Sequence, residues 1–150
     1  MQRRNGFTLV EVMLVVVLLA MAAVGAEMLA PISATRSIQA ATESQKLMAA
    51  LRMSRQTALA SQTTVRLRLL GSPRLVTGYV VEQQSGGRFI PLMPEEIISG
   101  LPVMTSNANS ILFSPTGSAD VSLVVNLGTG RQNHQVSVVA GTGLVRYVKR

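Results

Sequence analysis

The sequence predicts an α+β protein in which a long N-terminal helix packs on a small antiparallel β-domain. Two observations predict the helix. The run from Phe7 to Ala26 is largely apolar and carries no charge except Glu11, and the stretch from Ser33 to Gln62 is rich in alanine and lacks glycine and proline. A third observation predicts the β-domain, because from Thr64 onward apolar and polar residues alternate between turns that contain glycine. A chain of 150 residues has room for one such domain.

The composition excludes several classes of function. The chain has no cysteine and one histidine, His134, which excludes disulfide frameworks, thiol nucleophiles and metal sites built from several histidines. Ser118, Asp120 and His134 lack the sequence context of a hydrolase triad. We therefore expect a protein that is not an enzyme and that holds no cofactor or metal. The net charge of +7 permits an anionic partner, but the basic residues are scattered along the chain.

The first apolar segment has the length of a membrane span. From Phe7 to Ala26 there are 20 residues, which as a helix cover about 30 Å, the thickness of the hydrocarbon core of a bilayer. Arg3 and Arg4 precede it, which predicts a cytoplasmic N-terminus with the rest of the chain on the far side of the membrane. A signal anchor, a twin-arginine signal and a secretory signal cleaved after Ala22, with a secreted enzyme behind it, are the alternatives.

These alternatives leave Glu11 without a role. A carboxylate inside an apolar span costs about a few kcal/mol, so its presence calls for a partner. If the chain were cut after Gly6, the new amine of Phe7 would lie four residues before Glu11, on the same face of the helix. A carboxylate in the first turn also interacts favourably with the helix dipole. Amine and carboxylate could then neutralise each other, within one chain or between neighbouring chains.

The residues from Gly6 to Glu11, with the apolar run behind them, resemble the class III leader of type IV pilins and type II secretion pseudopilins. The resemblance implies that a prepilin peptidase cuts between Gly6 and Phe7, that Phe7 becomes N-methylated, and that Phe7 and Glu11 serve filament assembly. It also implies a pilin-like fold and other pilins or pseudopilins as partners. The expected location is the bacterial inner membrane, with the C-terminal domain in the periplasm.

The remaining chain divides at changes of pattern. We expect a leader at 1–6, a transmembrane helix at 7–30 that Pro31 kinks, an amphipathic helix at 31–62 and a β-rich domain at 63–150. The apolar face expected on the amphipathic helix consists of Ala41, Leu47, Met48, Leu51, Ala58 and Leu59. After a strand that starts near Val65, the expected strands are Leu75–Glu82, Arg88–Leu92, Val103–Thr105, Ile111–Phe113, Val121–Leu127, Gln135–Ala140 and Leu144–Val148. We interpret Glu95 and Glu96 as a solvated pair in a turn.

A second resemblance extends over most of the chain. The helix end at Leu51–Ala58, the turn at Ile111–Ser118 and the closing segment Val136–Arg146 are similar to the GspH/FimT group of minor pseudopilins and minor pilins. This resemblance implies a minor pseudopilin of a type II secretion pseudopilus, which supports protein export across the outer membrane. The alternative is a FimT-like type IV minor pilin that binds DNA for natural transformation. Its contacts to phosphate would come from the tail residues Arg146, Lys149 and Arg150, extended by Arg66, Arg68 and Arg131.

Overall fold

The computed structural model describes residues 9–28, 32–98, 103–128 and 133–149, with the side chains of 22–37 and 103 left aside. The chain divides into two compact units, Met1–Ile32 and Ser33–Arg150, which are described separately below. The predicted leader at 1–6, Phe7 and the predicted kink at Pro31 lie outside the described residues.

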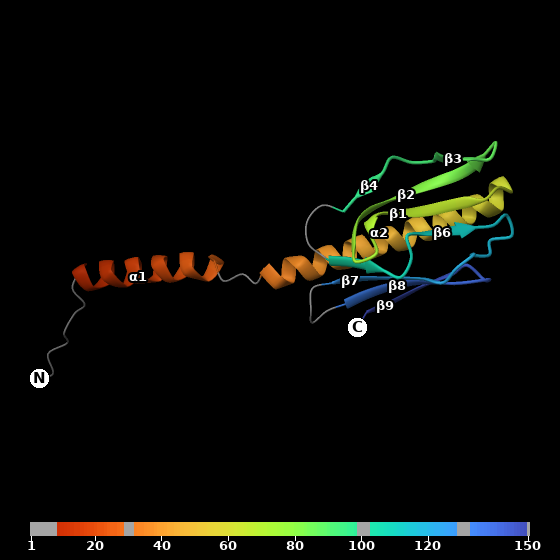
Figure 1. Cartoon of the computed structure of the whole chain (residues 1–150). Coiled ribbons are helices and arrows are strands. Elements are labelled where there is room, and N and C mark those ends of the chain that lie inside the picture. The colour runs from red at the N-terminus through yellow and green to blue at the C-terminus, as the bar shows by residue number, and fades with distance from the viewer. Residues whose placement is uncertain (1–8, 29–31, 99–102, 129–132, 150) are drawn as a thin grey trace, which may run out of the picture. The chain divides into compact units, whose positions relative to one another are not determined.

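Two helices form the N-terminal part of the chain. Helix α1 spans Leu9–Met28 and helix α2 spans Ile32–Ser61 (Figure 1). Helix α2 ends where the sequence predicts, because Gln62 adopts a left-handed backbone (φ 53°) and its side chain donates a hydrogen bond of 2.8 Å to the carbonyl of Leu59. Among the described residues, no helix combines the length and the apolar character that crossing a membrane requires.

The buried face of α2 differs in part from the predicted one. Its members recur every three or four residues: Ala40, Ser44, Leu47, Ala50, Leu51, Ser54 and Ala58. Ala41 and Met48 are only half-buried, and Leu59 is 38% exposed. Two serines take part because their hydroxyls donate hydrogen bonds of 2.7 Å within the helix, to the carbonyls of Ala41 and Ala50. Paired in this way, serine behaves as a small core residue.

The first sheet is antiparallel and contains five strands. These are β1 (Val65–Ser72), β2 (Leu75–Ser85), β3 (Arg88–Pro91), β4 (Glu96–Ile97) and β6 (Ser110–Phe113). The order is β3-β2-β1-β6, and β4 also pairs with β2, nearer the start of that strand than β3 does. The sequence did not indicate β4, because a strand of two residues has no readable alternation. Its pairing with Gly78 and Tyr79 corrects the interpretation of Glu96 as part of a solvated turn.

The second sheet is antiparallel and contains four strands in the order β5-β7-β8-β9. Their bounds are Val103–Ser106, Leu123–Gly128, Asn133–Val139 and Leu144–Lys149. Strand β7 starts two residues later than predicted. Asp120 explains the delay, because its Oδ1 accepts hydrogen bonds from the backbone N–H groups of Leu112 (2.9 Å) and Val121 (2.8 Å) and so holds a turn.

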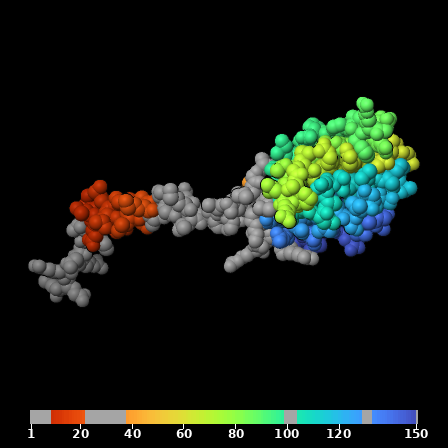
Figure 2. Space-filling model, in the orientation of Figure 1, coloured from red at the N-terminus to blue at the C-terminus, as the bar shows by residue number. Residues whose placement is uncertain are grey.

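The core of unit 33–150 lies where α2 meets the inner faces of both sheets (Figure 1). Leu47 and Leu51 of α2 are fully buried. The sheets contribute further fully buried side chains, among them Val65, Leu67, Met104, Ile111, Phe113, Leu123, Val125, Leu127 and Val136. In Figure 2 the first sheet forms the upper part of this unit and the C-terminal strands form the lower part. The predicted α+β class is confirmed, with the strands divided between two sheets.

Candidate functional site

Helix α1 exposes apolar side chains on every side. Within residues 9–21 each large aliphatic side chain is between 47% exposed, at Val15, and 76% exposed, at Leu9. An amphipathic surface helix would confine such residues to one stripe. A helix that is apolar all round is stable in water only when other apolar groups cover it, and lipid chains or neighbouring helices are the two usual covers. Binding to an apolar environment is therefore the chemistry that α1 offers.

Glu11 is the acidic residue in the first turn of α1. Its carboxylate is at the end of the helix where the unpaired N–H groups and the helix dipole favour a negative charge. The other predicted assembly residue, Phe7, and the predicted cleavage residue Gly6 lie outside the described residues. The pairing of the Phe7 amine with Glu11 therefore stays a prediction.

The predicted basic surface spreads over different faces. Arg146 and Lys149 are both exposed on β9, but they are three residues apart, so the alternation of a strand places them on opposite faces of the sheet. Arg131 and Arg150 lie outside the described residues. Arg66 and Arg68 lie on the first sheet, where both are paired with a carboxylate.

Comparison with known protein families identifies the family of this chain. Residues 1–26 match the family described as the prokaryotic N-terminal methylation motif. Residues 43–143, more than half of the chain, match the family described as type II transport protein GspH. The chain belongs to the GspH family. It is thus a minor pseudopilin or minor pilin of the type IV pilin-like class. No curated protein matches it by sequence.

Solved structures share the fold of this GspH-family chain. The minor pseudopilin EpsH from the type 2 secretion system of Vibrio cholerae superposes with a TM-score of 0.62 at 10% identity, over 73% of this chain and 96% of EpsH. The type IV minor pilin FimU of Pseudomonas aeruginosa gives a TM-score of 0.60 at 13% identity, over 71% of this chain and 86% of FimU. At these identities the likeness is one of fold.

The single histidine is a buried member of β8. His134 is 2% exposed and is the second residue of the strand. Its Nδ1 lies 2.6 Å from the hydroxyl of Tyr147, and the two rings stack with centroids 5.9 Å apart. Burial lowers the pKa of His134, and the charge of Lys149 lowers it further. The side chain of Ser118 hydrogen-bonds to Ser114 (2.7 Å), and Asp120 accepts from backbone N–H groups, so the three residues of the imagined triad each engage different partners.

A buried carboxylate that the sequence analysis missed joins β1 and β2. Glu82 is 5% exposed, and its oxygens lie 2.6 Å from Nη2 of Arg66 and 3.2 Å from Nη2 of Arg68. The Arg66 guanidinium also lies 3.9 Å above the ring of Phe89. The alternation of Arg66 and Arg68 along one strand was the available signal, because it places both on one face, opposite an acid on the next strand.

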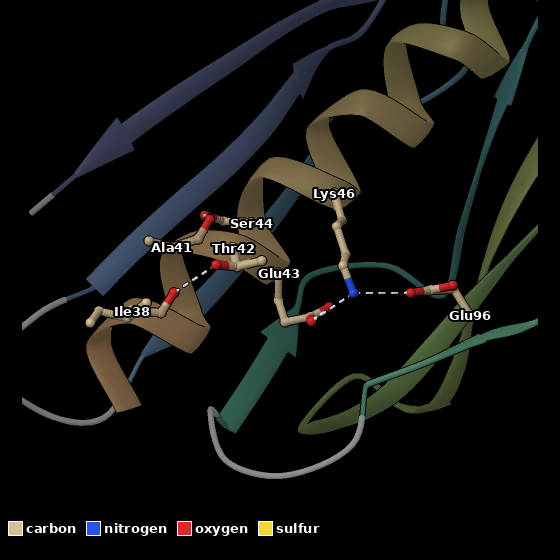
Figure 3. A network of polar contacts seen from close by, with 7 residues as sticks. All are labelled: Ile38, Ala41, Thr42, Glu43, Ser44, Lys46 and Glu96. Atoms are coloured by element: carbon tan, nitrogen blue, oxygen red, sulfur yellow. Dashed lines mark hydrogen bonds and ion pairs between the residues drawn. The ribbon is translucent and has the colours of Figure 1, made fainter. Parts of the chain in front are cut away.

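A second ion pair network ties α2 to the β4 segment. Lys46 Nζ lies 3.1 Å from Oε1 of Glu43 and 3.2 Å from Oε1 of Glu96. Figure 3 shows the Lys46 side chain between these two carboxylates. The hydrogen bond to Glu43, followed by that to Glu96, raises the pKa of Lys46. Burial, aided by the same two carboxylates, raises the pKa of Tyr79 to about 12. Among the described residues no three histidine, aspartate or glutamate side chains are placed to hold a metal ion.

Proposed function

We propose that this chain is a minor pseudopilin of a type II secretion pseudopilus, where it supports protein export across the outer membrane. The observation that carries the proposal is α1, whose apolar side chains are exposed on all sides and whose first turn holds Glu11. The match over residues 43–143 to the family described as type II transport protein GspH supports the proposal. The function is assembly with other subunits and involves no catalysis.

The proposed sequence of events starts at the membrane. The segment 7–26, part of which lies outside the described residues, holds the precursor in the inner membrane with its N-terminus in the cytoplasm. Prepilin peptidase removes residues 1–6 and methylates Phe7, and the methylation motif over residues 1–26 supports this step. Glu11 then neutralises a terminal amine in the filament. Transfer of the apolar helix from the bilayer to the filament costs little free energy, because lipid chains and packed aliphatic side chains are similarly apolar.

The alternative is a minor pilin of a pilus that takes up DNA through Arg146, Lys149 and Arg150. The likeness to FimU keeps a pilus role open, since the fold is common to both machines. The two roles separate in a strain that lacks the gene. A secretion role leaves exported proteins in the periplasm, whereas a DNA-uptake role lowers natural transformation and leaves export intact.

The proposed role in assembly is tested by replacing, in separate variants, the glutamate at each end of α1. Glu11→Gln removes the charge in the first turn, and Glu27→Gln removes the other acidic charge of the helix, near its C-terminal end. We expect Glu11→Gln to reduce the amount of subunit recovered in filaments by about tenfold or more, at an unchanged membrane level, because an amine in an apolar filament core loses its counter-charge. The Glu27→Gln control keeps normal recovery. Normal recovery of Glu11→Gln would overturn the proposed mechanism.

A further inference from the structure

A cleft in unit 33–150 lies between α2 and the turn that joins β8 to β9. It encloses about 230 Å³ and is lined by Arg52, Arg55, Gln56, Gly143, Leu144 and Val145. All six residues belong to the same compact unit, so the cleft does not depend on the placement of α1.

The two arginines of the cleft lack a carboxylate partner within the described part of the chain. The ion pairs found there join Lys46, Arg66 and Arg68 to glutamates. Asp120, on the neighbouring turn, directs its Oδ1 to two backbone N–H groups. Arg52 and Arg55 are one helical turn apart, and they therefore place two positive charges side by side at the cleft.

The cleft is built by close packing. Arg55 Nε donates a hydrogen bond of 3.0 Å to the carbonyl of Gly117, which fixes the side chain against the turn after β6. Gly143 lies against the same carbonyl and against the Arg55 side chain, with φ +63°, and a Cβ atom there would collide with the Gly117 oxygen. Glycine at 143 thus lets the β8–β9 turn approach Arg55 and form one wall of the cleft.

We propose that this cleft binds the side-chain carboxylate of an acidic peptide segment from another protein chain. Guanidinium groups bind carboxylates through paired N–H donors, and partial enclosure strengthens such pairs relative to fully solvated ones. Leu144, 46% exposed, offers an apolar contact beside the charge. A DNA duplex fits less well, because a rod about 20 Å wide cannot enter a cleft of this size and binds many basic residues at once. This site is separate from the assembly helix of the proposed function.

The test uses the full chain in detergent micelles and a tetraglutamate peptide with blocked ends as the probe. Nuclear magnetic resonance follows the arginine Nε–H signals and the backbone signals of 143–145. We expect saturable shifts at Arg52, Arg55 and the turn, and no shifts with tetraglutamine. Arg52→Glu should weaken binding by about tenfold or more, since a charge-assisted contact is lost. Arg88→Glu, a matched change at an exposed arginine of β3, should keep the affinity within about twofold.

Three results would overturn the proposal. Shifts spread evenly over Arg88 and the cleft would indicate nonspecific attraction to a basic protein. Equal affinities of the two variants would remove Arg52 from the site. Tighter binding of octathymidylate than of tetraglutamate at the same ionic strength, with shifts at the cleft, would assign it to nucleic acid. All these readouts are independent of processing at Phe7, so failure of the proposed function and failure of this site are distinguishable.

Discussion

At the scale of single residues, His134 couples stability to pH. Its pKa is lower in the folded chain than the ordinary value of 6.5, so the unfolded chain takes up a proton first as the pH falls. The stabilising contribution is complete above pH 6.5 and is lost as the pH falls toward the lowered pKa. We expect the thermal midpoint of unfolding to decrease when the pH is lowered from about 7.5 to about 5. The decrease should be smaller in His134→Gln, whose amide can still pair with Tyr147.

The comparison of the two pH dependences isolates this residue. Carboxylates also titrate toward the lower end of that range, and they do so in both proteins. The difference between wild type and His134→Gln therefore reports the histidine alone. Parallel curves for the two proteins would show that protonation of His134 does not oppose folding.

Glu82 is the second residue whose environment makes a strong prediction. Glu82→Gln leaves Arg66 and Arg68 without their common counter-charge while preserving the size of the side chain. We expect a loss of about 2 kcal/mol in the free energy of unfolding, less than for a fully buried pair because both arginines are partly exposed. Chemical denaturation of the full chain measures it. Glu95→Gln, at an exposed acid, is the control, and an equally small effect of both changes would contradict the assigned role of Glu82.

At the scale of elements, the turn between β8 and β9 depends on a glycine. Gly143 and Gly87 both have positive φ, +63° and +81°, but only Gly143 lies against other groups. Gly143→Ala should cost about 2–4 kcal/mol, because backbone strain adds to a collision with the Gly117 carbonyl. Gly87→Ala should cost about 1 kcal/mol, for strain alone. Similar losses in urea unfolding would show that the turn does not pack against Gly117.

The helices and strands differ in how well they can be predicted from the sequence. Strands β1, β6, β7 and β8 were predictable because one face of each is buried, which forces alternation, as along Val65–Leu69. The late start of β7 was not predictable from the sequence. The turn before this strand is held by the Asp120 carboxylate, which accepts a hydrogen bond from a backbone N–H of β6, eight residues earlier. The sequence analysis also missed the buried serines of α2. A serine is expected to be exposed unless its hydroxyl has a partner, and here the partners are carbonyls of the helix itself.

At the scale of the whole molecule, the α+β class could be predicted, but the division into two sheets could not. Strand pairing across long sequence separations, such as β1 with β6, is decided by packing on α2. The assembly site stays a prediction, and it could be proposed from the sequence because Gly6 to Glu11 form a linear motif. The cleft beside Arg55 was not, because it joins three segments through Gly117 and Gly143.

The assembly mechanism depends most on how the mature chain begins. Intact mass and N-terminal sequencing of the protein, taken from membranes of cells that express the native peptidase, determine this directly. We expect a chain that begins at N-methylated Phe7. A chain that begins at Ala23, or one that keeps Met1 to Gly6, would contradict the assembly mechanism, because no amine would then be formed beside Glu11.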